Sequence, residues 1–246
     1  MALFSPRYAA GDMVEVAGVP VRLKVDGRAR RVSLRLDASR REVIATAPSP
    51  RRLKDAVAFA VERAQWIGQT AARLPAAIPL APGGVIEVLG RPCRLARAAS
   101  RLQQGLYEAE DGALRLAAAG EGEAFARSAV RLLKGEALRV LSARTRVHAE
   151  ALGRPLPKIS VMDARSRWGS CTPARGLRAA GIRYSWRLIL APWSVMDYVA
   201  AHECAHLVHA DHSPRFWAAV DTLEVEVKAS RAWLRANGTR LHLLGR

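Results

Sequence analysis

The most constraining feature of the sequence is the segment His202-Glu203-Cys204-Ala205-His206, which is followed by His212. Residues four apart lie on one face of an α-helix, about 6 Å apart along its axis. Two imidazoles in that arrangement can bind one metal ion at about 2.0–2.1 Å each, and a Glu next to the first His can reach a water molecule beside the ion. The spacing therefore predicts a helix with His202 and His206 as metal ligands and Glu203 as general base.

The third metal ligand is predicted to be His212. It lies six residues beyond His206, so the helix must end and the chain must turn back before His212 can approach the ion. Three imidazoles leave one position open, which is typical of catalytic zinc and not of structural zinc. In the metzincin pattern a glycine stands where this chain has His209. The alternative third ligands are His209, Asp211, Glu224 and Glu226.

Local signals favour a helix for this motif and a second helix after it. Pro192 suits a first helical turn, because its missing N–H is not needed there. Ser213-Pro214 is typical of a helix start, with Ser as the N-cap. We expect the first helix to end within 207–210 and the second to continue to about residue 236, where Asn237-Gly238 is typical of a helix end.

The rest of the chain predicts an α+β fold, with strands in the first half and the helical metal region last. Residues 13–47 alternate apolar and polar side chains, which predicts a small antiparallel sheet, and Ser49-Pro50 then begins a helix. Further strands are expected at 85–89, 92–97, 113–117, 158–162 and 178–184, and a long helix at 121–152. The segment 74–84, rich in Pro and Ala, is expected to be a loop or linker. No internal repeat is identified.

The composition limits the class of protein. Half of the 246 residues are hydrophobic, yet no run of about eighteen apolar residues occurs, so we expect no membrane span. The first residues lack the order of a signal peptide, and three scattered cysteines favour a reducing cytoplasm over a disulfide framework. Cys204 is expected to be a small buried apolar residue and not a ligand.

The charge is strongly positive, with 39 Lys and Arg against 22 Asp and Glu, a net +17. Residues 22–54 carry 11 basic and 3 acidic side chains, and residues 154–187 carry 8 and 1. Such a chain attracts polyanions such as nucleic acid or nucleotides. An Arg- and Ala-rich chain encoded by a GC-rich genome has the same composition, so both interpretations stay open.

The sequence resembles the YgjP-like metallopeptidase family and, more distantly, the SprT-like and Wss-type zinc proteases. Three segments carry the resemblance: R-A-R-R-V-S-L-R-L at 28–36, R-S-R-W-G-S-C at 165–171, and the H-E-x-x-H region at 198–217. The resemblance covers about residues 20–235. It implies a zincin-like fold and one zinc ion bound by His202, His206 and His212. The family usually has an Asn where this chain has Ser185.

On this basis the chain is divided into three regions. Residues 1–75 are expected to form a β-rich region with a helix, 76–120 a short β-strand segment, and 121–246 the zincin-like catalytic region. About 20–235 would then act as one family domain.

The segment Trp168-Gly169-Ser170 has two interpretations. It could serve packing, with Gly169 allowing close backbone approach, or it could be an edge strand that pairs with an extended substrate. Arg165 or Arg167 would then hold a carboxylate or phosphate. The candidate substrate contacts are Arg165, Arg167, Trp168, Tyr198 and Arg215. The candidate oxyanion donors are Tyr184, Tyr198, His209 and Arg215.

These features predict a zinc-dependent hydrolase, with a metalloendopeptidase acting on protein or peptide as the leading hypothesis. Glu203 would accept the proton of the attacking water. The first alternative is a zinc-dependent nucleotide or phosphate-ester hydrolase, with the Arg-rich segments binding phosphate. The second is a nucleic-acid-binding protein whose zinc is structural or vestigial. The sequence predicts no particular oligomeric state.

Overall fold

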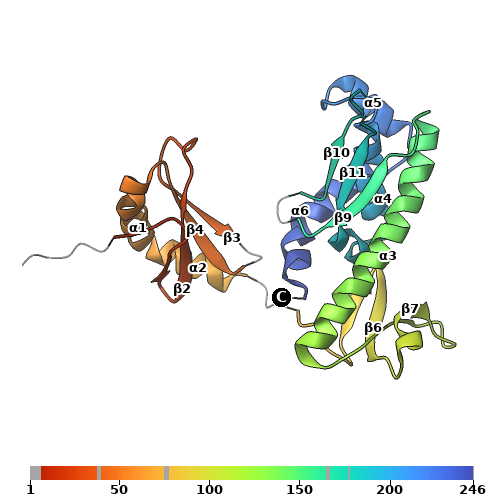
Figure 1. Ribbon diagram of the computed structural model, residues 1–246, viewed down its shortest axis with the longest axis horizontal. Coiled ribbons are helices and arrows are strands. Elements are labelled where there is room, and N and C mark those ends of the chain that lie inside the picture. Colours follow the sequence, from red (N-terminus) through yellow and green to blue (C-terminus); the bar gives the residue numbers. More distant parts are fainter. Residues whose placement is uncertain (1–6, 38–39, 75–77, 165–166, 177, 246) are drawn as a thin grey trace, which may run out of the picture. The chain divides into compact units, whose positions relative to one another are not determined.

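The computed structural model describes residues 7–37, 40–74, 78–164, 167–176 and 178–245 (Figure 1). The chain divides into two compact units, Met1–Ala76 and Ala77–Arg246. The expected mixed α+β class is confirmed, with the sheets concentrated in the first half and most helices later. Within the described residues, no helix combines the length and apolar character needed to cross a bilayer.

The first unit is a four-stranded sheet covered by two helices. Its strands are β1 (Met13–Val16), β2 (Val19–Val25), β3 (Ser33–Asp37) and β4 (Glu42–Ala47), in the order β1-β2-β4-β3. A short 3-10 helix η1 (Pro50–Arg52) leads into α1 (Leu53–Glu62) and α2 (Ala64–Ala72). The core lies between sheet and helices and includes Val21, Leu23, Val43, Ala45, Leu53, Ala60 and Ile67.

The expectation of a purely antiparallel sheet at 13–47 was wrong, because β2 and β4 are parallel. Strand direction alternates along the chain, so β4 runs in the same direction as β2. When β4 rather than β3 pairs with β2, the pairing must be parallel. Alternating hydrophobicity predicts the strands correctly but carries no information about which strands are neighbours.

A second sheet, in the second unit, has the same topology. It contains β5 (Val85–Val88), β6 (Arg91–Arg97), β7 (Gly105–Glu108) and β8 (Leu114–Ala118), in the order β5-β6-β8-β7, with a 3-10 helix η2 (Arg101–Gln103) before β7. Again the central pair is parallel and the outer pairs are antiparallel. The sequence E-V-x-G-x-P-x-R-L occurs at 15–23 and again at 87–95. The conclusion that the chain has no internal repeat was therefore wrong.

The first hairpin of each copy explains the shared glycine. Ala17 and Gly18 have φ of 54° and 72°, and Leu89 and Gly90 have φ of 51° and 81°. Two successive positive φ angles are the geometry of the type I′ turn, which suits a two-residue hairpin. The register of the parallel pair also repeats, since Val21 lies opposite Val43 and Cys93 opposite Leu114. The copies diverge after β4 and β8, where the helices differ in length.

The long helix α3 (Gly122–Ala151) connects the two sheets of the second unit. It contacts β7 and β8 of the repeated sheet and also β9 and α4 further along the chain (Figure 1). The third sheet consists of β9 (Lys158–Met162), β10 (Gly169–Thr172) and β11 (Gly181–Ser185), in the order β10-β11-β9. Strand β10 thus lies at an edge, and among the described residues it pairs with β11 alone.

The last elements are the 3-10 helix η3 (Trp186–Leu190) and helices α4 (Trp193–Ala205), α5 (Pro214–Asp221) and α6 (Val227–Leu243). The single helix expected from Ser213 to about 236 is in fact two helices, because the chain turns between them and Glu224 takes a φ of 53°. Gly238 does not end a helix but lies inside α6. A Cβ there would stand 3.0 Å from Cζ2 of Trp168, so this glycine allows α6 to approach that ring.

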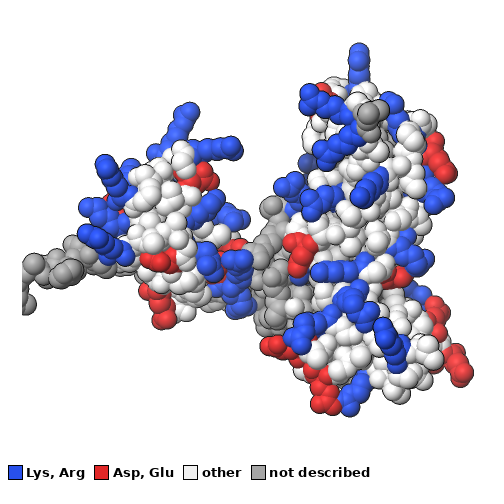
Figure 2. Space-filling model, viewed as in Figure 1, with Lys and Arg blue, Asp and Glu red and all other residues white. Residues whose placement is uncertain are grey.

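Basic side chains are spread over the visible face of each unit, with acidic side chains between them (Figure 2). Many are paired, as Arg22 is with Glu42 and Arg91 with Glu108. The positive net charge alone therefore does not mark a binding site on this face.

A partly buried ionic network fixes α4 against α3. The guanidinium of Arg144 donates two hydrogen bonds to the carboxylate of Asp197, at 2.6 and 3.0 Å, and His148 Nε2 lies 2.7 Å from the same carboxylate. Burial raises the pKa of Asp197, but the hydrogen bonds from His148 and Arg144 outweigh it and leave this pKa below its usual value. Asp197 is therefore charged in the folded protein, and this charge helps to hold the two helices together.

We predict that Asp197→Asn destabilises the protein by roughly 3 kcal/mol, because the partly buried Arg144 and the buried His148 lose the carboxylate to which they bond. Asp55→Asn is the matched control, since its pair with Arg52 is exposed and should contribute at most about 1 kcal/mol. Denaturant unfolding measures both. Because the folded pKa of Asp197 is lowered, the difference from wild type should persist above the usual pKa of 3.8 and shrink as the pH falls below it. Equal effects of the two variants would contradict this role.

Candidate metal centre

Helix α4 carries His202 and Glu203 and is buried on nearly all sides. It contacts α3, η3, α5, α6 and β10, and its apolar residues are almost all inaccessible to solvent. Cys204 is fully buried, as the sequence predicted, and its thiol faces the Thr145 carbonyl. A helix enclosed in this way holds its side chains in fixed positions.

The chain leaves the helix soon after His202. The helix ends at Ala205, slightly before the predicted range, and the N–H groups of Leu207, Val208 and His209 donate to carbonyls of Cys204 and Ala205. Asp211 Oδ1 then accepts a hydrogen bond from the Ser213 N–H just before α5 begins. These two turns reverse the chain and bring His212 back to the end of α4.

Three imidazoles converge at this point. The Nε2 atoms of His202 and His212 are 3.2 Å apart, and the ligand atoms of His202, His206 and His212 all lie within 4.8 Å of one another. Two nitrogens bound at about 2.0–2.1 Å to one tetrahedral ion stand about 3.3 Å apart. Among the described residues, the proposed rivals Asp211, Glu224 and Glu226 are not part of this group.

The hydrogen bond of His206 determines which of its nitrogens is free. Its Nδ1 lies 3.0 Å from the His209 carbonyl oxygen, which can only accept, so Nδ1 carries the proton. Nε2 is then unprotonated and available to a metal. His209 thus contributes through its backbone, and its imidazole is outside the converging group.

Phe216, a residue of α5, packs against all three imidazole rings. It is fully buried, and its ring centroid lies 5.0, 4.5 and 4.8 Å from those of His202, His206 and His212. Trp217 adds a second aromatic wall about 6 Å from His202 and His212. Phe216 therefore positions all three candidate ligands, a role that the H-E-x-x-H pattern does not reveal.

Burial keeps the imidazoles of His202 and His206 neutral. Burial, together with repulsion of a positive charge by His206, His212 and Arg231, lowers the pKa of His202 to about 4. Burial likewise lowers the pKa of His206. Since metal ions bind the unprotonated ring, His202 is ready to act as a ligand at neutral pH.

Glu203 lies against the edge strand β10, and only 6% of it is exposed. A Cβ added to Gly169 would stand 2.4 Å from Glu203 Oε1, so the absence of a side chain at 169 makes room for this carboxylate. Burial raises the pKa of Glu203 to about 7, although the Cys171 backbone N–H and the charge of Arg167 act in the opposite direction. A carboxylate with a pKa near neutral is suited to accept and return a proton.

Two cavities meet at His202, Glu203 and Gly169. The first, of about 400 Å³, has mostly apolar and aromatic walls with two cations and is lined further by Trp168, Tyr198, Val199, Arg231, Leu234 and Arg235. The second, of about 340 Å³, is lined further by Ser170, Cys171, Pro173, His206, Ala210 and His212. A ligand that occupied both would pass directly over Glu203.

The predicted substrate contacts differ in whether they lie near the two cavities. Trp168 and Tyr198 line the first cavity, and Arg167 is close enough to lower the pKa of Glu203. Arg215 is exposed and lines neither cavity. Arg165 lies outside the described residues.

Tyr184 is unsuited to be an oxyanion donor. It is fully buried and its hydroxyl bonds to Thr145, 2.9 Å away. Sequence reasoning also missed Arg231 and Arg235. The only sequence feature that connects these two residues is their separation by four positions, which places both on one face of a helix.

A family model described as the YgjP-like metallopeptidase domain matches residues 30–237. The chain belongs to this family. Searches of curated proteins and of solved structures give no match. Membership supports a metal-dependent hydrolase of the metallopeptidase type at the level of the family, for which zinc is the typical ion. In this YgjP-like chain the three-His group is suited to such an ion, because it offers three imidazole nitrogens within 4.8 Å of one another, two of them 3.2 Å apart.

We predict that His212→Ala weakens zinc binding by more than about 100-fold, because loss of a residue that merely supports a ligand already costs about 10–100-fold. His209→Ala is the matched control. It keeps the backbone carbonyl that accepts from His206 and should bind zinc nearly as wild type does. Competition with a chromophoric chelator measures both affinities. Equal losses in the two variants would remove His212 from the metal site.

Gly169→Ala should displace the Glu203 carboxylate while leaving the three imidazoles in place. We expect a loss of turnover of about 100-fold, the usual cost of moving a reacting group by about 1 Å, with zinc content unchanged. Gly181→Ala on the neighbouring strand β11 is the control, since its Cβ would meet only ordinary contact, 3.6 Å from the Lys158 carbonyl oxygen. An active Gly169→Ala variant would show that this contact does not position Glu203.

Proposed function

We propose that this chain is a zinc-dependent metalloendopeptidase with a zincin-like catalytic region. One zinc ion would be bound by His202, His206 and His212, and Glu203 would be the general base. The observation that carries the proposal is the 3.2 Å separation of the His202 and His212 Nε2 atoms beside a buried glutamate. Structural zinc sites fill all four positions with protein ligands, whereas this group offers three.

The chemistry is divided between the ion and the chain. Zinc, when bound, supplies a Lewis acid that makes water more acidic and polarises a carbonyl group. Glu203 would take a proton from the attacking water and pass it to the leaving nitrogen, for which its raised pKa of about 7 is suited. Tyr198 lines the cavity and is a candidate donor to the developing oxyanion.

The position of β10 at the edge of its sheet favours a polypeptide as the substrate. An extended chain could pair with β10 and run along it across Glu203. Two cavities adjoin Glu203, one lined also by Tyr198 and Leu234 and the other by His206 and His212, so the substrate could occupy both, as cleavage within a chain requires. Trp168, Tyr198 and Leu234 would receive an apolar side chain next to the scissile bond.

A second candidate function is hydrolysis of a phosphate ester or nucleotide. It is favoured by Arg231 and Arg235, which line the cavity next to Glu203 and could bind a phosphate. The same residues could bind an acidic peptide side chain, so the cations alone do not separate the two reactions. Zinc-loaded protein should be assayed in parallel with unfolded protein substrates and nucleoside triphosphates, with a chelator as control. Cleavage of nucleotides alone would replace the peptidase assignment.

We predict that Glu203→Gln retains zinc but loses about 100- to 10,000-fold in turnover, because the amide cannot accept the proton. Glu150→Gln, an exposed glutamate on α3, should behave as wild type. Metal content and rate are measured on the same preparations. Turnover within a few-fold of wild type in the zinc-loaded Glu203→Gln protein would exclude Glu203 as general base.

A further inference from the structure

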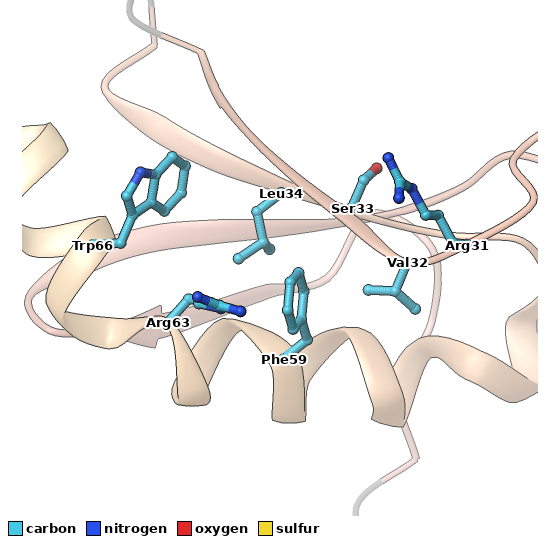
Figure 3. Close-up of a pocket in the computed structure, with 7 residues that line it drawn as sticks. All are labelled: Arg31, Val32, Ser33, Leu34, Phe59, Arg63 and Trp66. Carbon is cyan, nitrogen blue, oxygen red and sulfur yellow. The ribbon is translucent and has the colours of Figure 1, made fainter.

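The first unit carries a groove that the proposed peptidase function does not use. A cavity of about 410 Å³ lies between β3 and the two helices and is lined by Arg31, Val32, Leu34, Phe59, Arg63 and Trp66. Figure 3 shows Val32 and Leu34 pointing toward Phe59, with Trp66 at one end and Arg31 at the other. The walls are thus apolar and aromatic, with the cation of Arg31 at one end and that of Arg63 beside Phe59.

The helices lie differently against the outer strand in the two copies of the repeated sheet. In the second unit α3 contacts the corresponding edge strand β7, and Arg131 and Ser128 of α3 bond to Gln104 just before that strand. In the first unit α1 packs mainly against β1, β2 and β4, and the side of β3 stays open, with Trp66 42% exposed. An apolar surface left open in this way is typical of a binding site.

The cations of the groove are available to a ligand. Neither Arg31 nor Arg63 forms an ion pair with any described residue. The guanidinium carbon of Arg63 lies 5.5 Å from the centroid of the Phe59 ring, which holds this cation over the cavity. Two unpaired cations beside apolar walls favour a ligand that combines acidic groups with a large apolar one.

The position of β3 indicates what kind of ligand fits. It is the last strand in the order β1-β2-β4-β3, so one side of its backbone has no partner strand among the described residues of the first unit. Free N–H and C=O groups at strand spacing match another polypeptide backbone, whereas a nucleic acid offers phosphates at a different spacing. Val32 and Leu34 also give one wall an aliphatic surface, which suits an apolar side chain better than a stacked base.

We propose that this groove is a docking site for an extended acidic polypeptide segment. The segment would add a strand to β3 and place one large apolar side chain between Leu34, Phe59 and Trp66. Acidic side chains on either side of it would pair with Arg31 and Arg63. This docking would be independent of the metal centre, so it can be tested whether or not the enzyme is active.

The test uses the full chain and a dye-labelled ten-residue peptide with a central Phe flanked by Asp and Glu. Fluorescence anisotropy should show saturable binding, weakened about tenfold or more by Arg63→Glu. Arg94→Glu is the matched control, because it makes the same charge change at an exposed arginine on β6. Trp66→Ala should weaken binding as well. Hydrogen exchange should show new protection at 31–37 when the peptide is bound.

Three results would overturn the proposal. The first is no saturable binding by the wild-type chain. The second is an equal loss in Arg63→Glu and Arg94→Glu, or equal binding of a peptide with Lys in place of its acidic residues, which would show attraction by net charge alone. The third is competition by a ten-nucleotide single strand that binds more tightly and depends on Trp66, which would assign the groove to nucleic acid. Cleavage of a short peptide at the metal centre should be unchanged in both groove variants.

Discussion

The candidate site depends on the place where α4 ends. If the helix continued past Ala205, His212 would be carried away along the axis, and only two imidazoles could approach one ion. The turn after Ala205 and the Asp211–Ser213 hydrogen bond instead return the chain, so that His212 Nε2 lies 3.2 Å from His202 Nε2. Phe216 then keeps the three rings in contact with one buried side chain.

The surrounding elements hold this arrangement in place from several sides. The Asp197 network fixes α4 to α3, and Gly169 on β10 leaves room for Glu203. On α6, Gly238 lets Trp168 approach, while Arg187 donates a hydrogen bond to the Leu241 carbonyl near the end of that helix. Burial therefore both rigidifies the site and shifts its proton equilibria, because the same packing that orders Glu203 raises its pKa to about 7.

Local patterns predicted local structure well. The spacing of His202, Glu203 and His206 predicted one helix for all three; His202 and Glu203 lie in α4, whereas His206 follows its last helical residue. The long helix predicted at 121–152 is observed as Gly122–Ala151. Features that depend on tertiary contacts were missed, including the parallel β2–β4 pair and the role of Gly238, which faces Trp168. Arg231 and Phe216 were also missed, because nothing in their own segments shows that they lie beside residues of α4. The internal repeat was missed in the sequence because its two copies share only a short motif and are followed by helices of different length.

The most direct test of the central claim is zinc-edge X-ray absorption on the full, zinc-loaded chain. We expect one zinc per chain with three imidazole nitrogens at about 2.0–2.1 Å and the scattering pattern of histidine rings. A first shell containing sulfur at about 2.3 Å, or one with fewer than three imidazoles, would contradict the three-His centre and the hydrolytic mechanism built on it.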